Sequence, residues 1–338
     1  LVISCPCALA LATPAALTSA ASALRAAGVI VRGENALESL SRSTHLLFDK
    51  TGTLTEGTLT IVDIRPEGDI GTDEILAIGA ALQHFSTHPI ARAFAAYTGA
   101  SDFEAVDYRV GAGLQAQRAG VPYRMGSAEF CRELAPQLPA APDDRLYWIA
   151  LCKEDAPLAW IGLDDHTREE AEAVIASATM AGLQVELITG DSSSQGPLLA
   201  RDLGINVVKR GLTPQQKMAH VQQLQSAGAV VTMVGDGLND APVLSLADAS
   251  FAVAGATDLA RTQADFVIVD GDLHAVASTW RKARQCRRII LQNFGWALGY
   301  NISAIPLAAM GFIPPWAAAI GMSLSSLLVV ANSLRLNR

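Results

Sequence analysis

The chain has 338 residues, of which half are hydrophobic and 17% are charged, and its formal net charge is -8. Soluble globular proteins contain about 25% charged residues, so the shortfall predicts membrane segments. The negative charge argues against nucleic acid as the main partner, because that role needs a basic face. Five scattered cysteines do not form a disulfide framework in a chain of this length, which favours a reducing compartment for the polar part.

Long uncharged stretches lie near both ends of the sequence. Residues 1–24 and residues 289–334 contain no charged side chain. A membrane helix needs about 20 apolar residues, so the first stretch predicts one span and the second predicts two. A Pro-Pro-Trp turn divides the second stretch into helices at about 290–311 and 315–334. Basic residues flank these runs, and the positive-inside rule places the intervening body in the cytoplasm.

Three short apolar segments in the body each lead into an aspartate. They are residues 45–48, 185–188 and 230–234, and they precede Asp49, Asp191 and Asp236. Amphipathic segments at 168–181 and 214–227 precede the second and the third of these segments and follow a helical period. Strands that alternate with helices predict a doubly wound parallel sheet, in which ligands bind at the carboxyl ends of the strands. We therefore expect the aspartates to converge on one site.

The composition changes between about residues 61 and 160, where Gly, Pro and Ala are frequent. We interpret this stretch as a second domain, of the α+β class, inserted into the first. The predicted order is a span at 1–24, a first domain in two parts at 25–60 and 161–280, the inserted domain at 61–160, and two spans within 289–334.

The strongest local signal is residues 49–55, which read DKTGTLT. An aspartate can attack phosphorus and form an aspartyl phosphate. The Thr-Gly-Thr turn that follows presents backbone N–H groups suited to phosphate oxygens. An ordinary loop after a strand would explain Asp49 alone, but it does not explain the whole heptapeptide together with the motifs downstream.

Two further motifs complete a recognisable set, namely Thr189-Gly190-Asp191 and the GDGLNDAP run at residues 235–242. In this order and spacing, the three motifs resemble those of the P-type ATPases over essentially the whole chain. The resemblance implies a haloacid dehalogenase-like phosphorylation domain, an inserted nucleotide-binding domain, and flanking transmembrane helices. It also implies ATP and Mg²⁺ as cofactors.

The same resemblance implies a role for each motif residue. Asp49 would attack the γ-phosphate of ATP, and Lys217 would neutralise the transferring phosphoryl group. Mg²⁺ would be held by Asp49, Asp236 and the carbonyl of Thr51, because this ion prefers such oxygens. The residues expected to complete the catalytic group are Thr189, Asp191, Asn239 and Asp240.

Soluble phosphatases with this fold are a competing class. They usually carry a second aspartate two residues after the nucleophile, where it serves as acid and base. Here that position is Thr51. Without the acid, hydrolysis should slow, and the phosphoenzyme would survive long enough to drive a conformational step. This difference favours a pump over a membrane-tethered phosphatase.

Four residues of the inserted segment match nucleotide contacts of the heavy-metal pumps. His88-Pro89 resembles their His-Pro motif, in which the histidine contacts adenine, although Thr87 replaces the usual glutamate. Gly111 and Gly113 resemble a glycine pair that lets the nucleotide approach the backbone. Gly126 stands where the family has another glycine contact. Gly-x-Gly alone is weak evidence for a nucleotide site.

The first apolar run contains Cys5-Pro6-Cys7. A proline inside a membrane helix kinks it and frees backbone carbonyls, so both thiols can face one cavity. Thiolates suit soft ions such as Cu(I) and zinc. The element resembles the CPC motif of heavy-metal P-type ATPases.

Residues of the last two predicted spans indicate which ion is carried. Tyr300-Asn301 and the pair Met322 and Ser326 resemble the signatures of copper(I) pumps. Zinc and cadmium pumps place a lysine and an aspartate in these helices, and both spans here lack charge. The favoured cargo is Cu(I), with a Zn(II)/Cd(II) exporter as the alternative.

The family resemblance also implies partners and a location. A copper chaperone would deliver Cu⁺, and the pump would cross a lipid bilayer several times, in a bacterial inner membrane, with its catalytic domains in the cytoplasm. The chain begins at Leu1 within an apolar run and without methionine. We therefore expect further sequence upstream, including the actuator domain and additional helices of such pumps.

Overall fold

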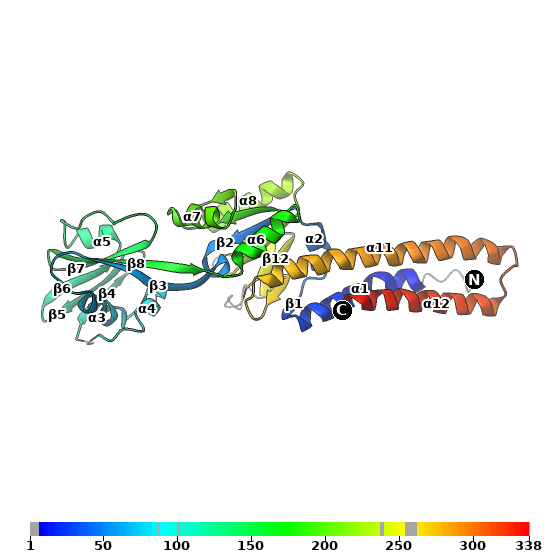
Figure 1. Cartoon of the computed structure of the whole chain (residues 1–338), viewed down its shortest axis with the longest axis horizontal. Coiled ribbons are helices and arrows are strands. Elements are labelled where there is room, and N and C mark those ends of the chain that lie inside the picture. Colours follow the sequence, from blue (N-terminus) through cyan, green and yellow to red (C-terminus); the bar gives the residue numbers. More distant parts are fainter. Residues whose placement is uncertain (1–6, 87, 100–101, 237–239, 254–261, 338) are drawn as a thin grey trace. The chain divides into compact units, whose positions relative to one another are not determined.

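The computed structural model describes residues 7–86, 88–99, 102–236, 240–253 and 262–337. These residues form two compact units (Figure 1). The first unit comprises Leu1–Asp49, Glu169–Gly190 and Leu203–Arg338. The second comprises Lys50–Arg168 and Asp191–Asp202. The chain therefore leaves the first unit directly after Asp49, the predicted nucleophile.

A seven-stranded sheet forms the centre of the first unit. Its strands in spatial order are β1 (Val29–Val31), β13 (Phe266–Ile268), β12 (Ala249–Ala252), β11 (Val231–Gly235), β2 (His45–Asp49), β9 (Gln184–Ile188) and β10 (Val207–Lys209). All neighbours run parallel except β1, which pairs antiparallel with β13. The predicted parallel α/β sheet is confirmed.

Helices cover both faces of this sheet because alternate strand residues point to opposite sides. On one face, Leu47 and Met233 pack against α8 (Pro214–Ser226) and α9 (Ala241–Leu246). On the other face lie α2 (Ala36–Arg42) and α6 (Ala171–Met180). The central strands are buried on both sides, and β2 and β11 accordingly carry almost uninterrupted apolar runs.

Three long helices belong to the same unit and lie side by side, namely α1 (Cys7–Ala26), α11 (His274–Ala309) and α12 (Pro315–Ser333) (Figure 1). A short 3-10 helix, η2 (Leu334–Asn337), follows α12. The predicted turn is present, and Pro314 and Pro315 stand at the N-terminal end of α12. Helix α11 begins 16 residues before the predicted start at 290, because the basic segment preceding the apolar run continues the same helix.

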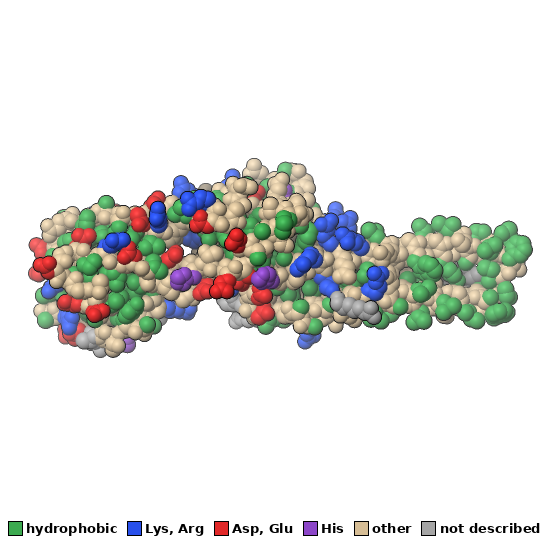
Figure 2. All heavy atoms as spheres, viewed as in Figure 1, with side chains coloured by type: hydrophobic (Ala, Val, Ile, Leu, Met, Phe, Trp, Pro, Cys, Tyr) green, Lys and Arg blue, Asp and Glu red, His purple; other side chains and the backbone are tan. Residues whose placement is uncertain are grey.

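Within the part of the chain that the structure describes, one helical segment, Pro315–Asn337, is long and apolar enough to cross a membrane. Small hydroxyl residues in α1, and basic residues in the first half of α11, dilute the apolar character of those helices. Large apolar side chains are nevertheless exposed on α11 and α12, such as Leu298 (58%) and Leu327 (63%). In Figure 2 apolar side chains cover the outer end of this helix group, and Lys and Arg gather at its other end.

A six-stranded antiparallel sheet forms the second unit. Its strands in spatial order are β3 (Thr55–Pro66), β8 (Ala156–Thr167), β7 (Tyr147–Lys153), β6 (Val121–Gly126), β5 (Gly113–Arg118) and β4 (Glu104–Arg109). Its helices are α3 (Thr72–Gln83), α4 (Pro89–Ala93), α5 (Ala128–Arg132) and α7 (Gln195–Asp202), and a turn, η1 (Lys50–Leu54), precedes β3.

The two faces of this sheet carry separate cores. Ile149 and Leu151 of β7 face the core that includes α3. The alternate residues Trp148, Ala150 and Cys152 face a smaller core with α5. The sheet extends beyond residues 61–160 at both ends, because β3 and β8 pair along nearly their whole lengths.

Candidate functional site

Three buried charged side chains meet at the carboxyl edge of the seven-stranded sheet. Asp49 is the last residue of β2, Lys217 lies in the first turn of α8, and Asp240 precedes α9. The Lys217 Nζ atom lies 2.7 Å from Asp49 Oδ1 and 2.8 Å from Asp240 Oδ1. Side-chain exposure is 10% for Asp49, 6% for Lys217 and 2% for Asp240. One ammonium group therefore bridges two carboxylates out of contact with bulk water.

Local structure explains how Lys217 reaches this position. Thr213 and Gln216 form a capping box that begins α8, and Pro214 occupies its first turn. Lys217 then follows within the first turn, so its long side chain extends from the start of the helix to the strand end. The sequence Thr-Pro-Gln-Gln that precedes the lysine thus fixes where helix α8 begins.

Burial shifts the pKa values of this group. It raises the pKa of Asp49 to about 7, because the charged form loses water, and the neighbouring carboxylates of Asp240 and Asp236 raise it further. Lys217 opposes this by attracting the carboxylate. Burial would lower the pKa of Lys217, but its two carboxylate partners more than reverse that effect and raise it. Asp49 thus titrates in the neutral range beside a permanently charged lysine.

The residues around Asp49 fit a magnesium ion. Asp236 follows β11 and lies close enough for its charge to raise the pKa of Asp49. Convergent carboxylates repel one another, and a hard cation with oxygen preference would offset that repulsion. Thr51 belongs to the turn η1 that follows Asp49, with Gly52 at φ 69°. Asn239, also expected here, lies outside the described residues.

Thr189 and Asp191 take different positions after β9. Thr189 is buried, and its backbone N–H donates to Lys209 at 2.8 Å in the first unit. In the second unit, the carboxylate of Asp191 accepts hydrogen bonds from Lys50 Nζ and from the Ser193 N–H, the latter at 2.8 Å. Burial alone would raise the pKa of Asp191, but the Lys50 and Ser193 hydrogen bonds lower it. Asp191 therefore pairs with the lysine that follows Asp49 in the chain.

Two residues that the sequence analysis missed hold the DKTGTLT turn in place. Asp165 accepts hydrogen bonds from Thr55 Oγ1 at 2.6 Å, Gly57 N at 2.8 Å and Thr58 N at 3.2 Å. Arg168 donates from Nε to the Thr55 carbonyl at 3.2 Å. The available signal was an Asp-Asp pair directly after an apolar run, the same pattern that precedes the other aspartates.

Replacing Asp165 by Ala should destabilise the second unit. It would remove the acceptor of the buried Thr55 hydroxyl and of the half-buried Gly57 N–H, at a cost of about 1–3 kcal/mol. Urea unfolding of the protein would measure this loss. Asp164→Ala is the matched control, since the Asp164 carboxylate accepts a hydrogen bond from the adjacent Asp165 N–H. Equal unfolding midpoints for the two variants would show that the hydrogen bonds of Asp165 do not stabilise the turn.

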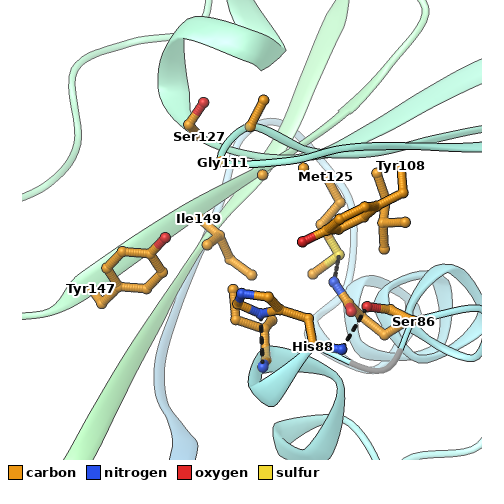
Figure 3. Close-up of a pocket in the computed structure, with 14 residues that line it drawn as sticks. Ser86, His88, Tyr108, Gly111, Met125, Ser127, Tyr147 and Ile149 are labelled. Carbon is orange, nitrogen blue, oxygen red and sulfur yellow. Dashed lines mark hydrogen bonds between the residues drawn. The ribbon is translucent and has the colours of Figure 1, made fainter. Parts of the chain in front are cut away.

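A pocket of about 80 Å³ opens in the second unit (Figure 3). Ile149 and Met125 supply apolar walls, and Tyr108 and Tyr147 add aromatic rings. The pocket is also lined by the four residues that the sequence predicts to contact a nucleotide, namely His88, Gly111, Gly113 and Gly126. A pocket with apolar walls, aromatic rings and a few polar groups is suited to a base.

His88 is oriented by local bonds. It caps α4, where Nδ1 accepts the Ile90 N–H at 3.3 Å, and its own N–H donates to Ser86 Oγ at 3.1 Å. The following Pro89 occupies the first helical position. Its exposed imidazole lies at the pocket, with Ser86 beside it (Figure 3). The His-Pro pair is thus a helix start that presents a ring to the pocket.

The glycines are required by close backbone contact. Gly113 and Gly126 are paired across β5 and β6. A Cβ atom on Gly113 would lie 2.3 Å from the Met125 carbonyl oxygen, and one on Gly126 would lie 2.1 Å from that of Ala112. The close pairing of β5 and β6 therefore excludes a side chain at Gly113 and at Gly126. Gly111 turns with φ 75° at the pocket rim.

His88→Ala should weaken nucleotide binding by about tenfold, because base stacking on an aromatic side chain contributes about 1–3 kcal/mol. Calorimetric titration with a non-hydrolysable ATP analogue would measure the change in Kd. His84→Ala is the control, since His84 is exposed at the end of α3 and does not line the pocket. If His88→Ala binds the analogue with unchanged affinity, the histidine does not contact the nucleotide.

The predicted metal-path residues lie on the long helices. Cys5 is outside the described residues, as is the side chain of Cys7, whose backbone begins α1. Tyr300, Asn301, Met322 and Ser326 are all half-buried on α11 and α12. Tyr300 faces α12, where a Cβ on Gly321 would lie 2.7 Å from its hydroxyl.

Polar contacts that the sequence analysis did not anticipate join α11 to α12. Trp296 Nε1 donates to Ser325 Oγ at 3.2 Å, and Asn293 Nδ2 donates to Ser333 Oγ at 3.0 Å. Asn293, Ser325 and Ser333 are buried. These bonds fix the register of the two helices and thereby the relative heights of Tyr300 and Met322.

Comparison with known proteins agrees with this architecture. The haloacid dehalogenase-like hydrolase family model matches residues 44–248. The chain is 37% identical over 358 residues to a probable copper-exporting P-type ATPase V of Mycobacterium tuberculosis, covering all of this chain and 46% of that protein. It therefore spans less than half the length of that relative.

Solved structures show the same likeness. A zinc-transporting PIB-type ATPase in the E2.Pi state is 32% identical, with a TM-score of 0.83, over 99% of this chain and 57% of that one. The catalytic domain of the CPx-ATPase CopB-B, from a structure of its conformational changes upon nucleotide binding, is 25% identical. The TM-score is 0.66, over 77% of this chain and 98% of that domain. The chain belongs to the haloacid dehalogenase-like hydrolases and, within them, to the P-type ATPases of the heavy-metal class.

Proposed function

We propose that this chain is the catalytic part of an ATP-driven exporter that moves Cu(I) out of the cytoplasm through an aspartyl phosphate on Asp49. The observation that supports it most is the buried ammonium of Lys217 within hydrogen-bond distance of Asp49 and Asp240. Phosphoryl transfer needs a positioned nucleophile and fixed positive charge, and this arrangement supplies both.

In the proposed reaction, a carboxylate oxygen of Asp49 attacks the γ-phosphorus of ATP. A new P–O bond forms on Asp49 while the bond to ADP breaks and ADP leaves. Lys217 carries fixed charge next to the attacking oxygen, and Asp240 holds that lysine in place. Mg²⁺, when held by Asp49, Asp236 and the Thr51 carbonyl, would offset negative charge on the transferring group. Thr189 would donate to the phosphoryl oxygens.

The second half-reaction distinguishes a pump from a phosphatase. Hydrolysis of the aspartyl phosphate requires a water and an acid or base that activates it. Thr51, two residues after the nucleophile, cannot fill that role as an aspartate would. We therefore propose a phosphoenzyme that persists until another part of the full-length protein, an actuator domain, supplies the missing group.

The identity of the transported ion is a more specific proposal than membership of the family. Cu(I) is favoured by two thiols in the first span and by the absence of charge from residues 289–334, where a divalent ion would need neutralising charge. A copper-exporting relative supports this, while the zinc-transporting neighbour favours Zn(II) as the second candidate. The proposal includes a copper chaperone as donor and a multi-pass membrane location with cytoplasmic catalytic units.

Metal-stimulated phosphorylation tests the proposal. The full-length protein, in lipid vesicles, is incubated with labelled ATP and either Cu(I) or Zn(II), then quenched in acid. Cu(I) should stimulate an acid-stable, alkali-labile label that Asp49→Asn abolishes. Stimulation by Zn(II) alone would replace the copper assignment, and label that survives Asp49→Asn would overturn the aspartyl-phosphate mechanism.

A further inference from the structure

A buried histidine and a buried glutamate join α8 to β9 in the first unit. His220 Nε2 lies 2.7 Å from Glu186 Oε2, and the two side chains are 15% and 7% exposed. An ionised carboxylate only accepts hydrogen bonds, so the imidazole N–H of His220 donates to Glu186. Neither side chain takes part in the reaction proposed above.

The pair connects two elements that contribute to the phosphorylation site. His220 follows Lys217 by three residues, so the two side chains lie on one face of α8, about 4.5 Å apart along its axis. Glu186 lies on β9, and it precedes Thr189, at the end of that strand, by three residues. The bond therefore ties the helix that carries Lys217 to the strand that leads into Thr189.

Apolar packing alone does not fix the position of α8 on the sheet. Ile188 of β9 and Val221 of α8 belong to the core between this helix and the sheet, and Glu186 points to the same face as Ile188. Burial of apolar side chains is non-directional, so it tolerates small shifts and rotations of the helix. A hydrogen bond requires a narrow range of distance and angle, and it supplies the missing restraint.

The contacts of Lys217 depend on such a restraint. Its Nζ atom lies 2.7 Å from Asp49 Oδ1 and 2.8 Å from Asp240 Oδ1. N–H···O bonds in proteins span about 2.7–3.2 Å, so a helix shift of about 1 Å away from either oxygen would break that bond. The ammonium group keeps both partners only while α8 stays in place.

We propose that His220 and Glu186 are positioning residues for phosphoryl transfer, whose buried hydrogen bond holds α8 where Lys217 reaches Asp49. The inference rests on the proposed function, because it concerns the same site. Misplacement of a catalytic group by about 1 Å costs on the order of 100-fold in rate. We therefore expect His220→Ala to slow phosphorylation about 10- to 100-fold while the affinity for an ATP analogue, which binds in the other unit, is unchanged.

Acetylation of lysines in the full-length protein, read by mass spectrometry, tests the position of Lys217 without relying on activity. The buried Lys217 should react slowly in the wild type, whereas the exposed Lys209 should react equally in every variant. His220→Ala and Glu186→Ala should each raise the reaction rate of Lys217 about tenfold. Glutamine can accept from the imidazole or donate to it, so Glu186→Gln should keep Lys217 protected and restore most of the phosphorylation rate.

Gln225→Ala is the matched control on the same helix. Gln225 Nε2 donates to the Leu246 carbonyl and to Asp248 Oδ2, both at 3.1 Å. Its removal breaks hydrogen bonds of α8 about 12 Å along the axis from Lys217, so acetylation of Lys217 and phosphorylation should both stay at the wild-type level. The double variant His220→Ala/Glu186→Ala should be no slower than the slower single variant, because both changes remove one bond.

Urea unfolding verifies that each variant is folded, and Glu186→Leu, which fills the same space without the carboxylate, serves if an alanine variant is not. Wild-type protection of Lys217 in the folded variants without the bond would overturn the inference. So would an equal loss of protection in Gln225→Ala, or a Glu186→Gln protein that behaves like Glu186→Ala. A wild-type protein that forms no phosphoenzyme would instead contradict the proposed function, and acetylation of Lys217 would still show whether the pair holds α8.

Discussion

Replacing Asp49 by Asn should abolish phosphoenzyme formation while nucleotide binding stays intact. Asparagine keeps the size of the side chain and an oxygen for Lys217 Nζ, but it is no nucleophile. Loss of a covalent nucleophile lowers turnover on the order of 10⁶-fold in a well-studied hydrolase. Acid-quenched incorporation of label from ATP measures the step. ATP-analogue affinity reports on the pocket at His88, which belongs to the other unit.

Two comparisons sharpen this result. Asp49→Glu keeps the charge but moves the carboxylate by one methylene, and misplacement by about 1 Å costs on the order of 100-fold. Asp202→Asn changes an exposed aspartate that pairs with the adjacent Arg201, and it should leave phosphorylation unchanged. Label in Asp49→Asn at the wild-type level would place the nucleophile elsewhere.

The pH dependence of the wild type follows from the same group. Burial and like charges raise the pKa of Asp49 from 3.8 to about 7. Below that pH the carboxyl group is protonated and cannot attack, so phosphorylation should rise as pH increases from about 6 to 8. The sign is opposite to that of a general acid, which becomes inactive by losing its proton. A rate independent of pH in this window would contradict the raised pKa.

Strand ends were the part of the site that sequence could locate. Short apolar runs bounded by Thr-Gly-Asp and Gly-Asp-Gly predicted where β9 and β11 end, and the structure has β9 at Gln184–Ile188 and β11 at Val231–Gly235. Parallel pairing then brings the following residues to one edge. Lys217 was found by its family motif, and its bridging of Asp49 and Asp240 needed the direction of α8.

Contacts between distant segments could not be predicted in this way. Asp165 contacts a turn 110 residues earlier in the chain, and nothing in its immediate sequence names that turn. The same holds for Asn293, which is buried against Ser333 within an apolar stretch. Both pairs depend on which segments fold side by side, and composition and periodicity carry no such information.

The starts of elements were also harder to predict than their existence. Helix α11 continues back to His274 because basic residues such as Arg281 and Arg288 are good helix formers, and hydropathy marks only where the apolar part begins. Similarly, β3 and β8 extend beyond the composition change at residues 61 and 160 because they pair with each other. Composition reports on solvent exposure, whereas pairing decides the boundary.

Replacing Lys217 by Met should lower the rate of phosphorylation about 10³-fold, since removal of one preorganised charge or donor at a reacting oxygen costs about 10²–10³. Methionine nearly preserves length and apolar volume. The variant leaves the buried carboxylates of Asp49 and Asp240 without the ammonium that bridges them. Loss of its attraction should raise the pKa of Asp49 above 7, because Lys217 is the group that lowers it.

The pH profile separates this role from a merely structural one. In Lys217→Met the midpoint of the rate should move to higher pH, whereas Lys217→Arg keeps the charge and should hold the midpoint near 7 even if the larger guanidinium slows the reaction. Lys209→Met, an exposed lysine of β10, is the matched control. ATP-analogue binding verifies folding of each variant. If Lys217→Met is slow but the midpoint of its pH–rate profile does not move, the lysine acts on the phosphoryl group alone and does not stabilise the ionised Asp49. The shift of that midpoint, more than the loss in rate, therefore decides what the buried ion pair does.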